Sequence, residues 1–190
     1  HPSRIWMRTG ATREGNLVNV RARIVIDGGA YTSSSIAVIS NATTFAPGPY
    51  EVPNALIEGT CVFTNNPPCG AMRGFGAVQV CFAHEGQMDK IAAALSMDPV
   101  EFRLRNAAAP GSVLPTGQVI RGAAPVREVI ERCAEIPMPS AAPPGPRDPL
   151  ELPGGAAGNV GRGEGVRRGV GFAVGYKNHA YSGGFDDSSE

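Results

Sequence analysis

The residues best suited to chemistry form a short loop, Arg73-Gly74-Phe75-Gly76, between a proline-rich segment and a long helical pattern. A helix N-terminus offers unpaired backbone N–H groups and a positive dipole end, which suit an anionic or oxo-bearing group. Arg73 would add a cation with forked donors, and Phe75 would present an aromatic face to a flat ligand. The loop indicates a ligand site, but a solvated arginine and a core phenylalanine beside helix-breaking glycines would give the same pattern.

Other residues that could carry chemistry are scattered along the chain. Glu85 interrupts an apolar helical stripe, and we expect it to pair with a neighbouring group rather than to act as a catalytic acid. His84 and His179 are isolated and are interpreted as surface residues. The four cysteines form no CxxC pair and match no zinc template, so we expect reduced thiols.

Composition bounds the class of protein. The chain has 190 residues, 42% of them hydrophobic, and its 17 basic residues balance its 17 acidic ones. This size and composition allow one folded domain or slightly more. The zero net charge argues against nucleic acid or an anionic membrane surface as the main partner. No apolar run reaches the roughly 18 residues of a membrane span, and we expect a cytoplasmic location.

The helical segments are the best-defined elements that must position the loop. Asp98 is placed as an N-cap with Pro99 at the first helical position, and Glu101 completes a capping box. The preceding helix is expected to run from Ala77 to near Ser96. The stripe expected to face its core comprises Val78, Cys81, Phe82, Met88, Ile91, Ala92 and Leu95.

Strands and helices follow one another without regular alternation, which predicts the α+β class. Residues 30–45 show no pattern that we can assign. Alternation and turn residues predict strands over 5–8, 17–27, 55–64 and 169–176, and a further helix over 126–135.

Domain organisation is expected to have three parts. Residues 1–136 form an α+β core, residues 137–165 form a proline- and glycine-rich loop or disordered insertion, and residues 166–190 contain a strand that leads into a missing second half. The first residue is not methionine, and the last residues follow directly on a strand-like run. We therefore expect a piece of a longer protein.

Most of the chain outside residues 137–165 resembles the molybdenum-cofactor-binding subunit of the molybdenum hydroxylases, the xanthine dehydrogenase and aldehyde oxidase family. The most specific match is the Arg73–Gly76 loop with Gln79. The other matching segments are 1–2, 10–15, 27–31, 48–54, 64–68, 88–89, 98–99, 103–106, 116–118, 171–173 and 185–187.

The resemblance implies a reaction and roles for the loop. The family hydroxylates a carbon of an aromatic heterocycle or an aldehyde, with oxygen from water and two electrons passing to molybdenum. By this resemblance, Arg73 and Gly74 bind the cofactor, the Arg73 backbone touches the molybdenum ligand sphere, and Phe75 stacks on the substrate ring. No catalytic residue is expected in this chain, because the general-base glutamate would lie downstream of Glu190.

The resemblance also implies the cofactors and partners. The parent would hold a molybdenum–molybdopterin cofactor, in a dinucleotide form, with iron–sulfur clusters and FAD on other domains or subunits. Its partners would be the missing half of the subunit, those redox subunits or domains, and a small-molecule substrate. The chain alone is expected to be inactive and largely free of cofactor.

The resemblance also implies a substrate class, through the same loop and residues 36–45. Gly74 stands where carbon monoxide dehydrogenases carry a cysteine, which argues against that activity. Phe75 favours a flat N-heterocycle of purine type. Residues 36–45 lack the substrate-gripping arginine of vertebrate-like xanthine enzymes, which argues against xanthine itself. Two alternatives stay open, namely an aldehyde substrate and a non-catalytic assembly or binding domain.

Overall fold

The computed structural model describes residues 1–137 and 171–177. Contacts divide the chain into two units, His1–Glu135 with Ala173–Glu190, and Ile136–Phe172. All helices and strands below belong to the first unit. The predicted loop over 137–165 lies outside the described residues except for Pro137, and so does most of the predicted segment over 166–190.

A three-stranded sheet in the order β1-β2-β3 forms the base of this unit. The strands are β1 (Ser3–Ala11), β2 (Leu17–Gly29) and β3 (Asn54–Phe63). The first pair is antiparallel and joined by a short turn, whereas β2 and β3 run parallel. A parallel pair needs a crossover connection, and the connection here contains a helix in the stretch that the sequence left unassigned.

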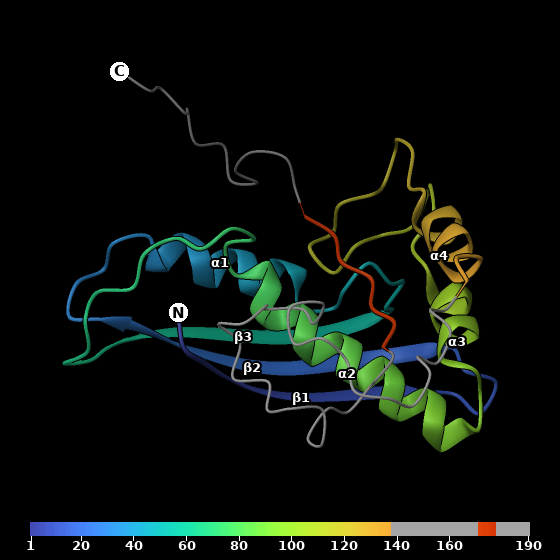
Figure 1. The fold of residues 1–190 in the computed structure, drawn as a ribbon, viewed down its shortest axis with the longest axis horizontal. Coiled ribbons are helices and arrows are strands. Elements are labelled where there is room, and N and C mark those ends of the chain that lie inside the picture. The colour runs from blue at the N-terminus through green and yellow to red at the C-terminus, as the bar shows by residue number, and fades with distance from the viewer. Residues whose placement is uncertain (138–170, 178–190) are drawn as a thin grey trace, which may run out of the picture. The chain divides into compact units, whose positions relative to one another are not determined.

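Helices α1 (Ser35–Phe45) and α2 (Ala77–Leu95) lie on one side of the sheet (Figure 1). The short helices α3 (Pro99–Asn106) and α4 (Val126–Ala134) follow in sequence. The Asp98 carboxylate accepts hydrogen bonds from the backbone N–H groups of Val100 and Glu101, which confirms the predicted N-cap. The mixture of strands and helices confirms the α+β prediction.

The apolar core differs in one respect from the predicted stripe on α2. Met88 and Ala92 are buried as expected, but Phe82 is 88% exposed and Val78 is also exposed. Val80 and His84 are buried in their place, so the interpretation of His84 as a surface residue was wrong. The buried face of α2, which includes Glu85, is therefore rotated toward Val80 and His84 relative to the prediction.

No strand forms in residues 171–176, the described part of the strand predicted over 169–176. The backbone N–H of Val174 instead donates to the Glu85 carboxylate, at 2.9 Å. The Val174 carbonyl accepts from the Cys81 thiol, at 3.8 Å. The Glu85 and Cys81 side chains of α2 therefore bind the N–H and the carbonyl of Val174, which a neighbouring strand would bind if residues 171–176 formed a strand.

Candidate functional site

The Arg73–Gly76 loop has an unusual backbone and ends where α2 begins. Gly74, Phe75 and Gly76 all have left-handed φ angles, of 95°, 49° and 97°. The N–H of Phe75 donates to the Met72 carbonyl, and the N–H of Ala77 donates to the Gly74 carbonyl. A bulky residue with positive φ is an outlier, and such backbone strain is common at ligand sites.

Gly76 brings the loop close to α1. A Cβ atom added at this position would lie 2.2 Å from the Val38 carbonyl oxygen, and the left-handed φ also favours glycine. A Cβ at Gly74 would lie 2.5 Å from a methyl group of Val78. Local packing therefore requires Gly76 whether or not the loop binds a ligand, whereas at Gly74 it is mainly the left-handed φ that favours glycine.

The predicted site residues differ in their exposure. Arg73 is exposed, and Phe75 is half-buried and packs against the cluster between the sheet, α1 and α2. In the first turns of α2, Gln79 Nε2 donates to the His1 carbonyl at 3.5 Å. Its Oε1 atom is buried and has no hydrogen-bond partner among the described residues. The loop thus offers an exposed cation and an aromatic ring, and the first turn of α2 adds an unused acceptor.

The end of β2 fixes the segment that leads toward this loop. Asp27 Oδ1 accepts hydrogen bonds from the Gly29 N–H at 2.8 Å and from Thr64 Oγ1 at 2.6 Å. Asn66 Nδ2 donates to the other oxygen. The hydrogen bonds from Thr64, Asn66 and Gly29 lower the pKa of Asp27. This carboxylate therefore holds the chain after β3 against the end of β2.

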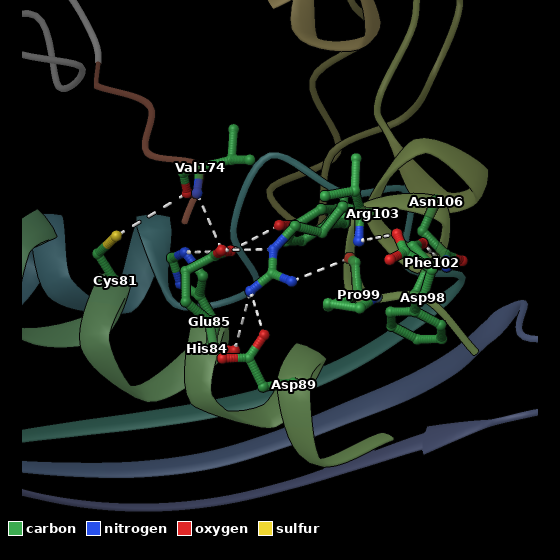
Figure 2. A network of polar contacts seen from close by, with 12 residues as sticks. Cys81, His84, Glu85, Asp89, Asp98, Pro99, Phe102, Arg103, Asn106 and Val174 are labelled. Carbon is green, nitrogen blue, oxygen red and sulfur yellow. Dashed lines mark hydrogen bonds and ion pairs between the residues drawn. The ribbon is translucent and has the colours of Figure 1, made fainter. Parts of the chain in front are cut away.

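A second polar cluster, which we call the Glu85 network, lies between α2 and α3 (Figure 2). Glu85 Oε2 accepts from Arg103 Nε at 2.8 Å, and Oε1 accepts from the Tyr50 hydroxyl at 2.6 Å. Arg103 Nη2 also donates to Asp89 Oδ1 at 2.8 Å. With the Val174 N–H, which also donates to Oε2, the Glu85 carboxylate accepts three hydrogen bonds.

Burial and neighbouring charges shift the pKa values of Tyr50, Arg103 and His84 in and beside the Glu85 network. Burial and the Glu85 carboxylate raise the pKa of Tyr50 far above its ordinary value. Burial alone would lower the pKa of Arg103, but its bonds to Glu85 and Asp89 outweigh that effect and raise it. Burial lowers the pKa of His84, whose Nε2 lies 3.6 Å from Glu85 Oε1. Tyr50 thus stays a neutral phenol and Arg103 stays a cation at neutral pH.

The Glu85 network joins α2 to α3, to Tyr50 and to the backbone of Val174. The described residues contain no group of three His, Cys, Asp or Glu side chains that could hold a metal ion. The expectation that Glu85 pairs with a neighbour is confirmed. Sequence reasoning missed Tyr50 and Arg103 as its partners, although a carboxylate on an apolar helical stripe signals that a buried cation must lie nearby.

All four cysteines are free, as expected.

Solved structures share this fold. Aldehyde oxidoreductase from Desulfovibrio gigas superposes with a TM-score of 0.63 at 32% identity, over 70% of this chain and 14% of that one. Quinoline 2-oxidoreductase from Pseudomonas putida 86 gives a TM-score of 0.62 at 29% identity, over 70% of this chain and 17% of that one. The chain therefore shares the fold of one part of each of these two oxidoreductases.

The sequence comparison identifies the family. Residues 1–107 match the molybdopterin cofactor-binding domain, and the chain belongs to that family. The large molybdopterin subunit of nicotinate dehydrogenase from Eubacterium barkeri is 44% identical over 135 residues, 71% of this chain and 32% of that protein. A subunit of a probable xanthine dehydrogenase from Bacillus subtilis is 40% identical over 138 residues, 73% of this chain and 18% of that protein. The chain thus spans a third or less of these relatives.

One further comparison concerns membranes. Among the described residues, no helix is both long enough and apolar enough to cross a lipid bilayer.

Proposed function

We propose that this chain is one part of a molybdenum hydroxylase and that the Arg73–Phe75 loop forms one wall of its active site. The observation that carries the proposal is the loop itself. Three consecutive left-handed residues place an exposed Arg73 and a half-buried Phe75 directly before the N-terminus of a 19-residue helix. The family match over residues 1–107 supports a molybdopterin cofactor as the bound group.

The residues present fit such a cofactor. A molybdopterin carries phosphate and a pterin ring with several hydrogen-bonding atoms. The Arg73 guanidinium and the N-terminal end of α2 suit the anionic groups. The buried, unpartnered Oε1 of Gln79 can accept a hydrogen bond from a donor on the ligand. We further propose the dinucleotide form of the cofactor, and a cytoplasmic location for the parent protein.

The chemistry divides between cofactor and chain. When bound, the cofactor supplies the molybdenum that takes two electrons from the substrate carbon, while water supplies the oxygen. Arg73 and Gly74 hold the cofactor at the loop, and Phe75 orients the substrate ring by stacking on it. The general base lies elsewhere in the parent, as do the remaining half of the subunit and the iron–sulfur and FAD groups that carry electrons away.

The proposed substrate is an aromatic N-heterocycle. The aromatic face of Phe75 suits a flat ring, and relatives are named for nicotinate, xanthine and nicotine. Aldehyde is the second candidate, because aldehyde oxidoreductase from Megalodesulfovibrio gigas is 35% identical over 117 residues. A non-catalytic assembly domain remains the alternative outside the enzyme class.

The substitution Phe75→Ala in the parent enzyme separates these candidates. Loss of one aromatic stack costs about 0.5–1.5 kcal/mol, a roughly two- to tenfold fall in kcat/KM for a purine or nicotinate. A small aliphatic aldehyde should lose much less. Equal losses for both substrates would remove Phe75 from the substrate site. Exposed Phe82 provides the matched control, since Phe82→Ala should change neither value.

A further inference from the structure

The face of the sheet opposite α1 and α2 carries a dense set of arginines, which we call the arginine face. Arg4 and Arg8 project from β1, Arg21 and Arg23 project from β2, and all four are exposed. Trp6 lies between the two β1 arginines and is 53% exposed. The Arg23 guanidinium lies over its ring, 5.4 Å from the centroid.

The arginine face concentrates unrelieved positive charge. Arg8 and Arg21 are directly opposite each other in the antiparallel register, and like charges in that position destabilise a sheet. None of the four arginines forms an ion pair with a carboxylate of the described residues. The repulsion is therefore not balanced within the described part of the chain, although the chain as a whole is neutral.

The side of the sheet opposite α1 and α2 is open to a partner. The sheet combines an antiparallel and a parallel pair of strands, and sheets with antiparallel pairing can leave one face exposed. Here α1 and α2 occupy one side (Figure 1), and the exposure of Trp6 and Leu56 shows that no described residue covers the other. An external partner that carries negative charge would both cover this face and relieve the Arg8–Arg21 repulsion.

The composition of the arginine face favours a polypeptide over a nucleic acid. Tryptophan and arginine are the residues that most often dominate protein–protein binding energy, and Leu56 adds exposed apolar surface. The neutral chain also lacks the net positive charge typical of nucleic-acid-binding domains.

We propose that the arginine face docks a second, different polypeptide through a carboxylate-rich surface. Each exposed guanidinium would pair with a carboxylate of the partner, and Trp6 would be buried near the centre of the contact. This inference is independent of the proposed active site, because the arginine face lies on the side of the sheet opposite the helices.

The test uses the full 190-residue chain with poly-L-glutamate as the probe. Trp6 is the only tryptophan of the chain, so its fluorescence reports directly on this face. We expect a saturable fluorescence change that weakens with salt. The double substitution Arg8→Gln with Arg21→Gln should weaken binding at least about tenfold. The same variant should keep or raise the unfolding midpoint, because it removes the like-charge pair.

The matched control is Arg13→Gln with Arg121→Gln, which removes two exposed arginines outside the arginine face. It should bind poly-L-glutamate within about twofold of the native chain. Absence of a Trp6 response, or equal weakening in the control, would overturn the proposal. Tighter binding of polyuridylate at matched charge would overturn it in favour of nucleic acid. A Trp6 change on concentrating the chain alone would assign the face to a second copy instead.

Discussion

Arg103 and Glu85 join α3 to α2 through a buried ion pair in which Arg103 Nε lies 2.8 Å from Glu85 Oε2. The Arg103 side chain has no exposed surface, and that of Glu85 is 6% exposed. The same carboxylate binds the Tyr50 hydroxyl and the Val174 N–H. One buried charge pair therefore links two helices, the chain before β3 and the segment from Ala173 to Lys177.

The first prediction concerns this pair. Arg103→Ala should lower the free energy of unfolding by about 3–5 kcal/mol, because it leaves the Glu85 carboxylate buried without its cation. Arg132→Ala is the matched control, since Arg132 forms only an exposed pair with Glu128 and should cost less than about 1 kcal/mol. Urea unfolding of the two variants measures both values. Similar losses in both would show that the Glu85 network contributes little.

The second prediction is a pH dependence of stability that arises from His84. Burial lowers its pKa in the folded chain, whereas the unfolded value is about 6.5. The unfolded chain therefore binds more protons as the pH falls through about 6.5, and the folded state loses stability there. The loss levels off below the folded pKa. In His84→Leu, the free energy of unfolding should fall less between pH 7.5 and 5.5 than in the native chain, and an unchanged slope would contradict this origin.

The third prediction compares two glycines of the same region. Gly76→Ala should destabilise the chain by more than about 1 kcal/mol, because of its left-handed φ and the Val38 carbonyl 2.2 Å from the added Cβ. Gly86→Ala lies within α2 with no atom within 4 Å of the new Cβ. It should stabilise the chain by about 0.5–1 kcal/mol. Thermal unfolding distinguishes the two signs, and a loss at both positions would refute the packing argument.

The fourth prediction concerns the start of α3. Asp98→Ala removes the side chain that caps two backbone N–H groups, at 2.8 and 2.9 Å. The expected cost is about 1 kcal/mol in the free energy of unfolding. Asp98→Asn should retain most of that energy, because asparagine caps helices about as well. An asparagine variant as unstable as the alanine variant would show that charge, rather than the hydrogen bonds, matters.

Local signals predicted much of the fold from sequence. The alternating residues of β2 and the Asp98 cap of α3 depend on neighbours in the chain, and both were located to within about two residues. Helix α1 was missed because β-branched and small polar residues give it weak helix propensity. Its buried Ser35 and Asn41 further obscured the apolar face. Packing on the sheet and α2 makes this segment helical.

Long-range pairing limited the prediction of the polar residues. Glu85 was expected to find a partner, but Arg103 and Tyr50 lie 18 and 35 positions away, and only the fold brings them together. His84 is buried beside the Tyr50 ring, 34 positions away in the chain, which the sequence pattern does not show. The loop residues Arg73, Gly74 and Phe75 were found because they are adjacent in sequence, but the left-handed φ of Phe75 was not foreseen.

The most direct test of the proposed molybdenum site is a metal analysis. The 190-residue chain and the same chain expressed with the flanking segments of its parent would both be purified, and molybdenum measured by mass spectrometry. We predict molybdenum in the longer protein only, with a decrease when Arg73 is replaced by glutamine and none for the matched change Arg121→Gln at another exposed arginine. A folded longer protein without molybdenum would contradict the assignment of the Arg73–Phe75 loop to a cofactor site.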